Sequence, residues 1–108
     1  MASDLTLVEC ERVIIRARAL DEITEKKAQN CRSRLIEATN HWHILRLGAD
    51  VVERARLPFP REPVRTLDAL HIASALIGRT ALPDLALLTL DERIRSAAKE
   101  LGFAILPK

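Results

Sequence analysis

Three acidic side chains in this chain of 108 residues have the type and the setting needed to bind a cation together. Asp68 lies near the start of an apolar stretch that predicts a helix over residues 65–78. Asp91 directly follows the apolar run 85–90, which is typical of a strand buried on both faces. Glu9 lies near the start of another helix-like stretch. Because sites in open α/β sheets form beyond the carboxyl ends of strands, we expect the three carboxylates to converge at one edge of the sheet.

The chemistry expected of such a cluster is that of a divalent metal ion. Clustered carboxylates repel one another and therefore need a cation, and hard oxygen ligands in an open cluster suit Mg²⁺ or Mn²⁺. A metal ion held this way could activate water and stabilise an in-line attack on a phosphate. Thr89 would point the same way as Asp91 along the strand and could hold a ligand or a water molecule.

The helix predicted over residues 65–78 is apolar around almost its whole circumference, which is typical of a helix inside a core. A buried ionised Asp68 is costly unless it is paired, and the helix N-terminus offers only about 0.3–1 kcal/mol. Asp68 therefore needs an arginine, a backbone nest or a metal ion. The alternative is a purely structural aspartate in the first turn. His71, one turn later, is interpreted as a packed core histidine rather than a ligand.

A narrow charged stripe marks the helix predicted over residues 5–20. Glu9, Arg12 and Arg16 stack on one face between two apolar flanks, because their spacing is i, i+3 and i+7. This stripe indicates either a polar site, in which the arginines could contact phosphates, or a buried ion-pair ladder. The alternative is an ion pair that merely neutralises Glu9.

The remaining elements alternate between helices and strands, which predicts a parallel α/β sheet flanked by helices. They are a basic helix over 22–40, a strand over 41–47, a short helix over 50–57, a rigid proline-rich loop over 58–63, a loop over 79–84, the strand 85–90, a helix over 92–101 ended by Gly102, and a last strand over 103–106.

Length and composition predict one small soluble domain, residues 1–108. No apolar run approaches the roughly 20 residues of a membrane span, and no signal peptide is recognisable. We therefore expect a cytoplasmic protein with no membrane contact, in which Cys10 and Cys31 are reduced thiols. A zinc site at Cys31, His41 and His43 is disfavoured, because a fourth ligand at proper spacing is missing. An aromatic content of 3% argues against a platform that stacks single-stranded bases.

The order and spacing of these motifs resemble the PIN domain family, and in particular the VapC-type toxins of bacterial toxin–antitoxin pairs. The resemblance runs from Ser3 to Pro107. It rests on Ser3-x-Leu5-Thr6-x-x-Glu9-x-x-Arg12, on Arg65-Thr66-Leu67-Asp68-Ala69-Leu70-His71-x-Ala73, and on Leu88-Thr89-Leu90-Asp91-Glu92-Arg93 with Gly102-Phe103 after the last helix.

The resemblance implies a PIN-like three-layer sandwich and an endoribonuclease that depends on Mg²⁺ or Mn²⁺. It also implies a homodimer and neutralisation by a small VapB-type antitoxin protein. By the match, Glu9, Asp68 and Asp91 fall on the second, third and fourth acidic positions of the family, and Thr89 falls on its hydroxyl position. Arg12 and Arg16 would neutralise Glu9 or hold the RNA backbone.

The chain departs from the family pattern at its start. The family begins with a central strand that ends in Asp-x-Ser and supplies the first acidic ligand, whereas here Met1 and Ala2 directly precede the second motif. We therefore expect the middle strand to be missing and the strand edges beside it to be open to pairing with another chain. A truncated reading of a longer gene, a shortened or degenerate copy, and a fold completed by a partner chain all remain open.

Two functions of different classes follow from this departure. The first is a PIN-type ribonuclease whose activity is weakened by the missing aspartate. The alternative is a non-catalytic, PIN-derived interaction module that binds an antitoxin or another copy of itself. A plain DNA-binding protein is disfavoured, because no turn-linked pair of helices with a recognition helix is visible.

Overall fold

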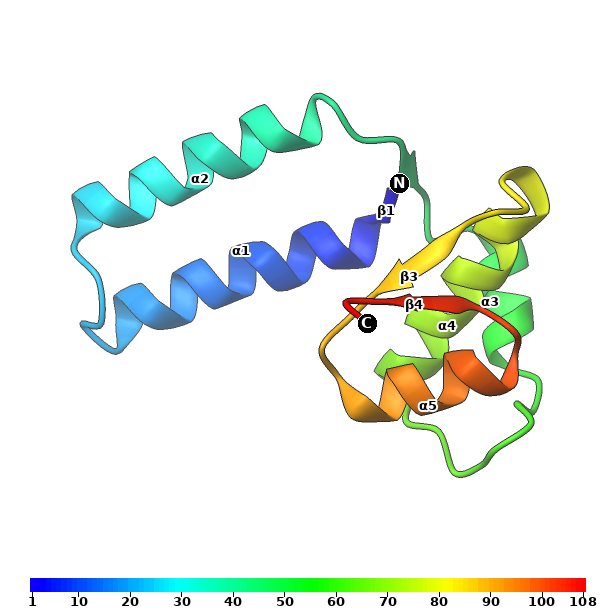
Figure 1. Cartoon of the computed structure of the whole chain (residues 1–108). Helices are drawn as coiled ribbons and strands as arrows, with labels where there is room; N and C mark the ends of the chain where they lie inside the picture. Colours follow the sequence, from blue (N-terminus) through cyan, green and yellow to red (C-terminus); the bar gives the residue numbers. More distant parts are fainter. The chain divides into compact units, whose positions relative to one another are not determined.

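The computed structural model describes residues 1–108 and divides them into two compact units, residues 1–46 and residues 47–108 (Figure 1). Five helices and four short strands make up the chain, so the predicted α/β class is confirmed. No helix combines the length and the apolar character that crossing a membrane requires. The elements are β1 (Ala2–Ser3), α1 (Asp4–Ala19), α2 (Glu25–Thr39), β2 (Ile44–Leu45), α3 (Ala49–Ala55), α4 (Thr66–Ala81), β3 (Ala86–Leu88), α5 (Glu92–Glu100) and β4 (Ala104–Leu106).

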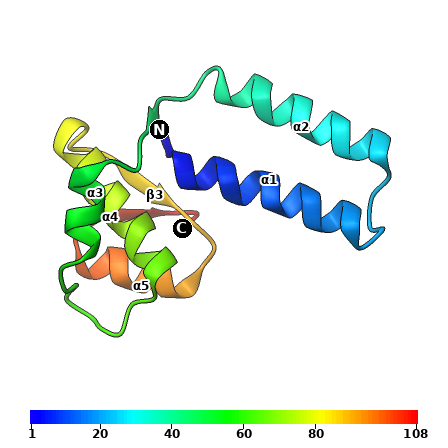
Figure 2. The same cartoon turned by 180° about the vertical axis from the view of Figure 1, so that it is seen from behind.

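The first unit is a hairpin of two helices with a short parallel strand pair at its open end. Helices α1 and α2 run side by side in both views (Figures 1 and 2), and each begins at a capping hydroxyl. The Ser3 hydroxyl accepts a hydrogen bond from the Thr6 N–H at 3.4 Å, and that of Thr24 accepts one from the Lys27 N–H at 3.1 Å. At the turn between the helices, Arg18 pairs with Asp21 at 3.0 Å.

The helices of this hairpin bury little apolar surface. Helix α1 has no fully buried residue, and α2 buries only Ala28. Val8 and Val13 of α1 keep 55% and 67% of their surface exposed, and Ile36 of α2 keeps 61%, so large apolar side chains of both helices lie in the open. Strands β1 and β2 pair in parallel, with Ala2 opposite Ile44.

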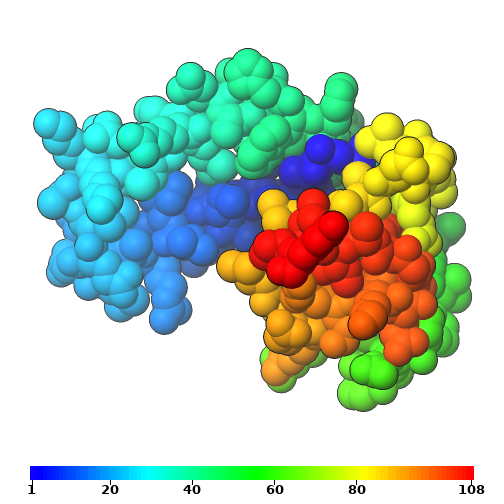
Figure 3. Space-filling model, viewed as in Figure 1, coloured from blue at the N-terminus to red at the C-terminus, as the bar shows by residue number.

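The second unit packs three helices and a parallel strand pair around a small core. Helices α3 and α4 lie on one side of the β3–β4 pair, as the two opposite views show (Figures 1 and 2). Ile72 of α4 is almost fully buried, and a cluster of Ala75, Ala98 and Phe103 joins α4 and α5 to the segment before β4. Small side chains at these helix positions let the backbones approach closely. Segments β3, α5 and β4 reach the surface of this unit in Figure 3.

The sheet differs from the prediction in strand length and burial. Strand β3 pairs with β4 alone and in parallel, β1 pairs with β2 alone, and neither pair has a third strand in the described chain. The prediction that 85–90 is buried on both faces is wrong, because Leu88 and Leu90 are 75% and 82% exposed. A strand with one neighbour and one uncovered side cannot bury an uninterrupted apolar run.

Two element boundaries also differ. Helix α4 continues beyond Gly78 to Ala81 because no residue there breaks it, and the first proline after the helix is Pro83. Only two residues of the predicted strand 41–47 pair with another strand. The N–H groups of His41 and Trp42 instead bond to carbonyls in the last turn of α2, which holds this segment as a turn.

Candidate functional site

Asp68 lies in the first turn of α4, on the wall of a cavity of about 680 Å³ within the second unit. The carboxylate is half-buried and forms no hydrogen bond or ion pair within the chain. A partly desolvated carboxylate without a partner favours a cation beside it. The cavity lies between the loop before α4, the first half of α4 and the first half of α5. Its lining consists of Arg61, Pro63, Val64, Arg65, Asp68, Ile72, Glu92, Arg93, Ser96 and Ala97.

The charged residues of this cavity differ in whether they already have a partner. Arg61 pairs with Glu100 at 3.1 Å, and Glu92 pairs loosely with Arg95 at 3.9 Å. Arg65 and Arg93 form no ion pair, and both are exposed. The cavity therefore combines one unpartnered carboxylate with two unpartnered guanidinium groups, on an apolar floor that includes the buried Ile72.

The loop that leads into α4 is held by one carboxylate. Glu62 accepts hydrogen bonds from the Phe59 N–H at 2.7 Å and from the Val64 N–H at 2.8 Å. The Phe59 ring is buried, and the Arg54 guanidinium lies over it at 4.5 Å. These contacts confirm the prediction of an ordered proline-rich loop, and they set the position of Arg65 at the start of α4.

Asp91 is the N-cap of α5. Its Oδ1 accepts hydrogen bonds from the Arg93 N–H at 2.9 Å and the Ile94 N–H at 3.4 Å, which leaves Oδ2 without a partner in the chain. The Thr89 hydroxyl accepts a hydrogen bond from the Asp91 N–H at 3.1 Å. Asp91 is exposed and lies outside the cavity lining, whereas the next two residues, Glu92 and Arg93, line the same cavity as Asp68.

Arg95 fixes the backbone beneath this turn. Its guanidinium donates hydrogen bonds to the carbonyl oxygens of Thr89 at 2.8 Å, Leu106 at 3.3 Å and Pro107 at 2.7 Å. The side chain therefore ties the carboxyl ends of β3 and β4 to α5. Sequence reasoning missed this role, since an arginine one turn after a capping aspartate reads as an ordinary surface residue.

Glu9 belongs to the first unit, where it is half-buried on α1 and has an interaction partner within the structure. Arg12 and Arg16 are exposed and form no ion pair. No ion pair joins Glu9 to either arginine in this structure, and the roles expected of Arg12 and Arg16 stay predictions. No group of three His, Cys, Asp or Glu side chains suited to a metal ion forms within either unit. Convergence of Glu9 with the two aspartates stays a prediction.

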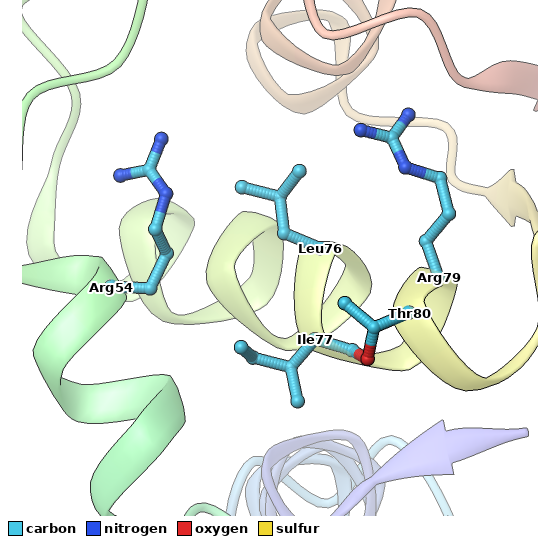
Figure 4. A pocket seen from close by; sticks show the side chains of 5 residues that line it. All are labelled: Arg54, Leu76, Ile77, Arg79 and Thr80. Atoms are coloured by element: carbon cyan, nitrogen blue, oxygen red, sulfur yellow. The ribbon is translucent and has the colours of Figure 1, made fainter.

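A second cavity of about 400 Å³ in the same unit offers no carboxylate. Figure 4 shows Arg54 of α3 and Arg79 of α4 extending to the same side, with Leu76 between them. Both arginines already make contacts within the unit. Arg54 lies over the Phe59 ring, as described above. Arg79 lies 4.1 Å over the Phe103 ring and donates a hydrogen bond to the Leu101 carbonyl at 2.8 Å. This cavity has packing contacts but no group for acid–base or metal chemistry.

The cysteines agree with the sequence interpretation. Cys10 and Cys31 are both free and half-buried, one on each helix of the hairpin. No disulfide therefore constrains the first unit, and its stability rests on helix caps and on the packing of α1 against α2.

Comparison with known proteins places this geometry in context. The model of the PIN domain family matches residues 1–100. Ribonuclease VapC46 of Mycobacterium tuberculosis (strain ATCC 25618 / H37Rv) is 38% identical over 80 residues, which cover 74% of this chain and 59% of that protein. Ribonuclease VapC35 of Mycobacterium tuberculosis (strain CDC 1551 / Oshkosh) is 34% identical over 56 residues, 52% of this chain and 42% of that protein. The chain thus spans roughly two to three fifths of these relatives. No solved structure matches it.

Proposed function

Because this chain belongs to the PIN domain family, we propose that it is an endoribonuclease of the VapC toxin type, which hydrolyses RNA phosphodiester bonds at an acidic Mg²⁺ or Mn²⁺ site. The observation that carries the proposal is the half-buried, unpartnered carboxylate of Asp68 on the wall of an arginine-lined cavity. The names of the curated relatives, both ribonucleases, support the same class of reaction.

The donor set fits a hard divalent cation. Asp68 and Oδ2 of Asp91 are carboxylate oxygens without partners in the chain, and carboxylates are preferred ligands of Mg²⁺ and Mn²⁺. We assign Asp68, Asp91 and Glu9 to the metal. When bound, the ion would activate water for attack on the phosphodiester. Thr89 supports Asp91 by accepting its backbone N–H, and Arg12 and Arg16, both free of ion pairs, would hold the RNA backbone.

The resemblance also supplies the proposed partners. We propose a VapB-type antitoxin protein as the inhibitor, a homodimer as the assembly and the cytoplasm as the place of action. The exposed apolar side chains of the hairpin, among them Val8 and Val13, support an interface with another protein.

The alternative function is a non-catalytic, PIN-derived module that binds an antitoxin or another copy of itself. One observation favours it, namely that neither unit by itself gathers three metal ligands. This alternative predicts that the isolated chain takes up no Mn²⁺ at millimolar concentration, whereas the nuclease proposal predicts uptake that depends on Asp68.

The deciding experiment measures cleavage of a labelled RNA by the purified chain with Mg²⁺ or Mn²⁺, beside Asp68→Asn and Asp91→Asn. We expect cleavage that needs the metal ion and falls at least about tenfold in each variant, because a ligand charge is lost while the shape is kept. Asp84→Asn is the matched control, since Asp84 is an exposed residue outside the cavity lining. Cleavage that both active-site variants retain would overturn the proposal.

A further inference from the structure

Arg65 and Arg93 have no role in the metal site, yet they lie on the same cavity as Asp68. They come from different segments, since Arg65 is the N-cap residue of α4 and Arg93 lies in the first turn of α5. Each guanidinium lacks a carboxylate partner, while the neighbouring Arg61 is already paired with Glu100. Two free guanidinium groups at one concave surface are typical of a site that recognises phosphate.

Local hydrogen bonds hold the backbone on both sides of this pair of arginines. Glu62 accepts two backbone N–H bonds in the loop just before Arg65, and Asp91 accepts the N–H of Arg93 itself. A guanidinium on an ordered backbone loses less conformational freedom when it binds an anion. The apolar floor of the cavity, which includes Ile72 and Ala97, suits the uncharged part of a nucleotide between two phosphates.

We infer that Arg65 and Arg93 form a binding site for backbone phosphates of single-stranded RNA. The site holds the strand so that a phosphodiester bond lies against Asp68. This inference rests on the proposed nuclease function and adds two substrate-binding residues to it. Its chemistry is contact with phosphate, so it predicts affinity for the backbone and no preference for a base sequence.

The test measures binding and not cleavage, so it separates this inference from the nuclease proposal. A fluorescein-labelled single-stranded RNA is titrated with the full chain in EDTA, and fluorescence anisotropy gives the Kd at several salt concentrations. We expect Arg65→Gln and Arg93→Gln each to raise the Kd about tenfold. We also expect each to flatten the slope of log K against log salt by about 0.7, because each removes one phosphate contact on a single strand.

Two further variants control for charge and for shape. Arg56→Gln removes an exposed arginine outside the cavity and is expected to leave Kd and slope close to those of the unchanged chain. Arg93→Lys keeps the charge but loses the two-pronged donor, so it should retain the slope with a weaker Kd. Thermal unfolding of all variants checks that exposed substitutions leave the fold intact.

The possible outcomes separate the two proposals. RNA binding that depends on Arg65 and Arg93, in a chain that cleaves nothing, supports this inference and contradicts the nuclease function. Cleavage with unchanged Kd and slope in both glutamine variants overturns the inference and leaves the nuclease function standing. Absence of RNA binding overturns it as well. Single-stranded DNA of the same sequence should show the same dependence on both arginines, and a different dependence would overturn the assignment to phosphate.

Discussion

Replacing Arg95 with alanine removes the side chain that ties α5 to the ends of β3 and β4. The guanidinium donates three hydrogen bonds to main-chain carbonyls, of Thr89 at 2.8 Å, Leu106 at 3.3 Å and Pro107 at 2.7 Å. The side chain is only 23% exposed, so water replaces these bonds incompletely in the folded protein. Its ion pair with Glu92, at 3.9 Å and with Glu92 87% exposed, adds little.

The size of the effect follows from the two short bonds. A net contribution of about 1 kcal/mol for each gives a loss of about 2 kcal/mol in the free energy of unfolding. The bond to Leu106 is long, and that residue is exposed, so its carbonyl can turn to water. For a small domain, about 2 kcal/mol lowers Tm by about 8–16 °C.

Urea unfolding followed by circular dichroism measures this loss directly. Arg93→Ala is the matched control, because Arg93 is an exposed arginine on the same helix without an ion pair, and we expect it to stay within about 0.5 kcal/mol of the unchanged protein. Arg95→Lys, which can reach one carbonyl, should lose about half as much as the alanine variant. Equal stability of Arg95→Ala and Arg93→Ala would refute the reasoning.

Two further substitutions test the supports of the cavity. Asp91→Ala removes the cap of α5 and should lower the free energy of unfolding, measured with urea, by about 1 kcal/mol. Asp91→Asn keeps a capping oxygen and should lower it by only about 0.3 kcal/mol. Equal losses in the two variants would contradict the role of Asp91 as a cap. Glu62→Ala removes the acceptor of two backbone N–H groups and should lower the free energy of unfolding by about 1–2 kcal/mol. The loop before α4 should then become a site of limited proteolysis. Unchanged resistance to protease would contradict the role of Glu62.

Local sequence signals predicted much of the fold because their causes are local. Gly102, predicted to end the last helix, follows α5 with a φ of 84°, a conformation that glycine adopts without strain. Asp68 lies in the first turn of α4, as predicted, whereas the role of Asp91 as the cap of α5 was not predicted. The C-terminal end of α4 was predicted wrongly, because a glycine such as Gly78 can lie in a helix interior as well as end a helix.

Features that depend on tertiary packing could not be predicted from the sequence. The exposure of Leu88 and Leu90 depends on which neighbours β3 has, and an apolar run cannot report that. The cavity arginines were missed because sequence reasoning looked for phosphate contacts beside Glu9, at Arg12 and Arg16. One available signal was an arginine close to each aspartate, with Arg65 three residues before Asp68 and Arg93 two residues after Asp91.

The three bonds of Arg95 also join parts of the chain that would otherwise fluctuate separately. The carbonyls of Leu106 and Pro107 share one guanidinium with that of Thr89. The Thr89 N–H in turn bonds to the Leu106 carbonyl at 2.9 Å. We therefore expect Leu106, Pro107, the strand before Asp91 and helix α5 to open together, so that loosening Leu106 and Pro107 also releases the residues around Asp91.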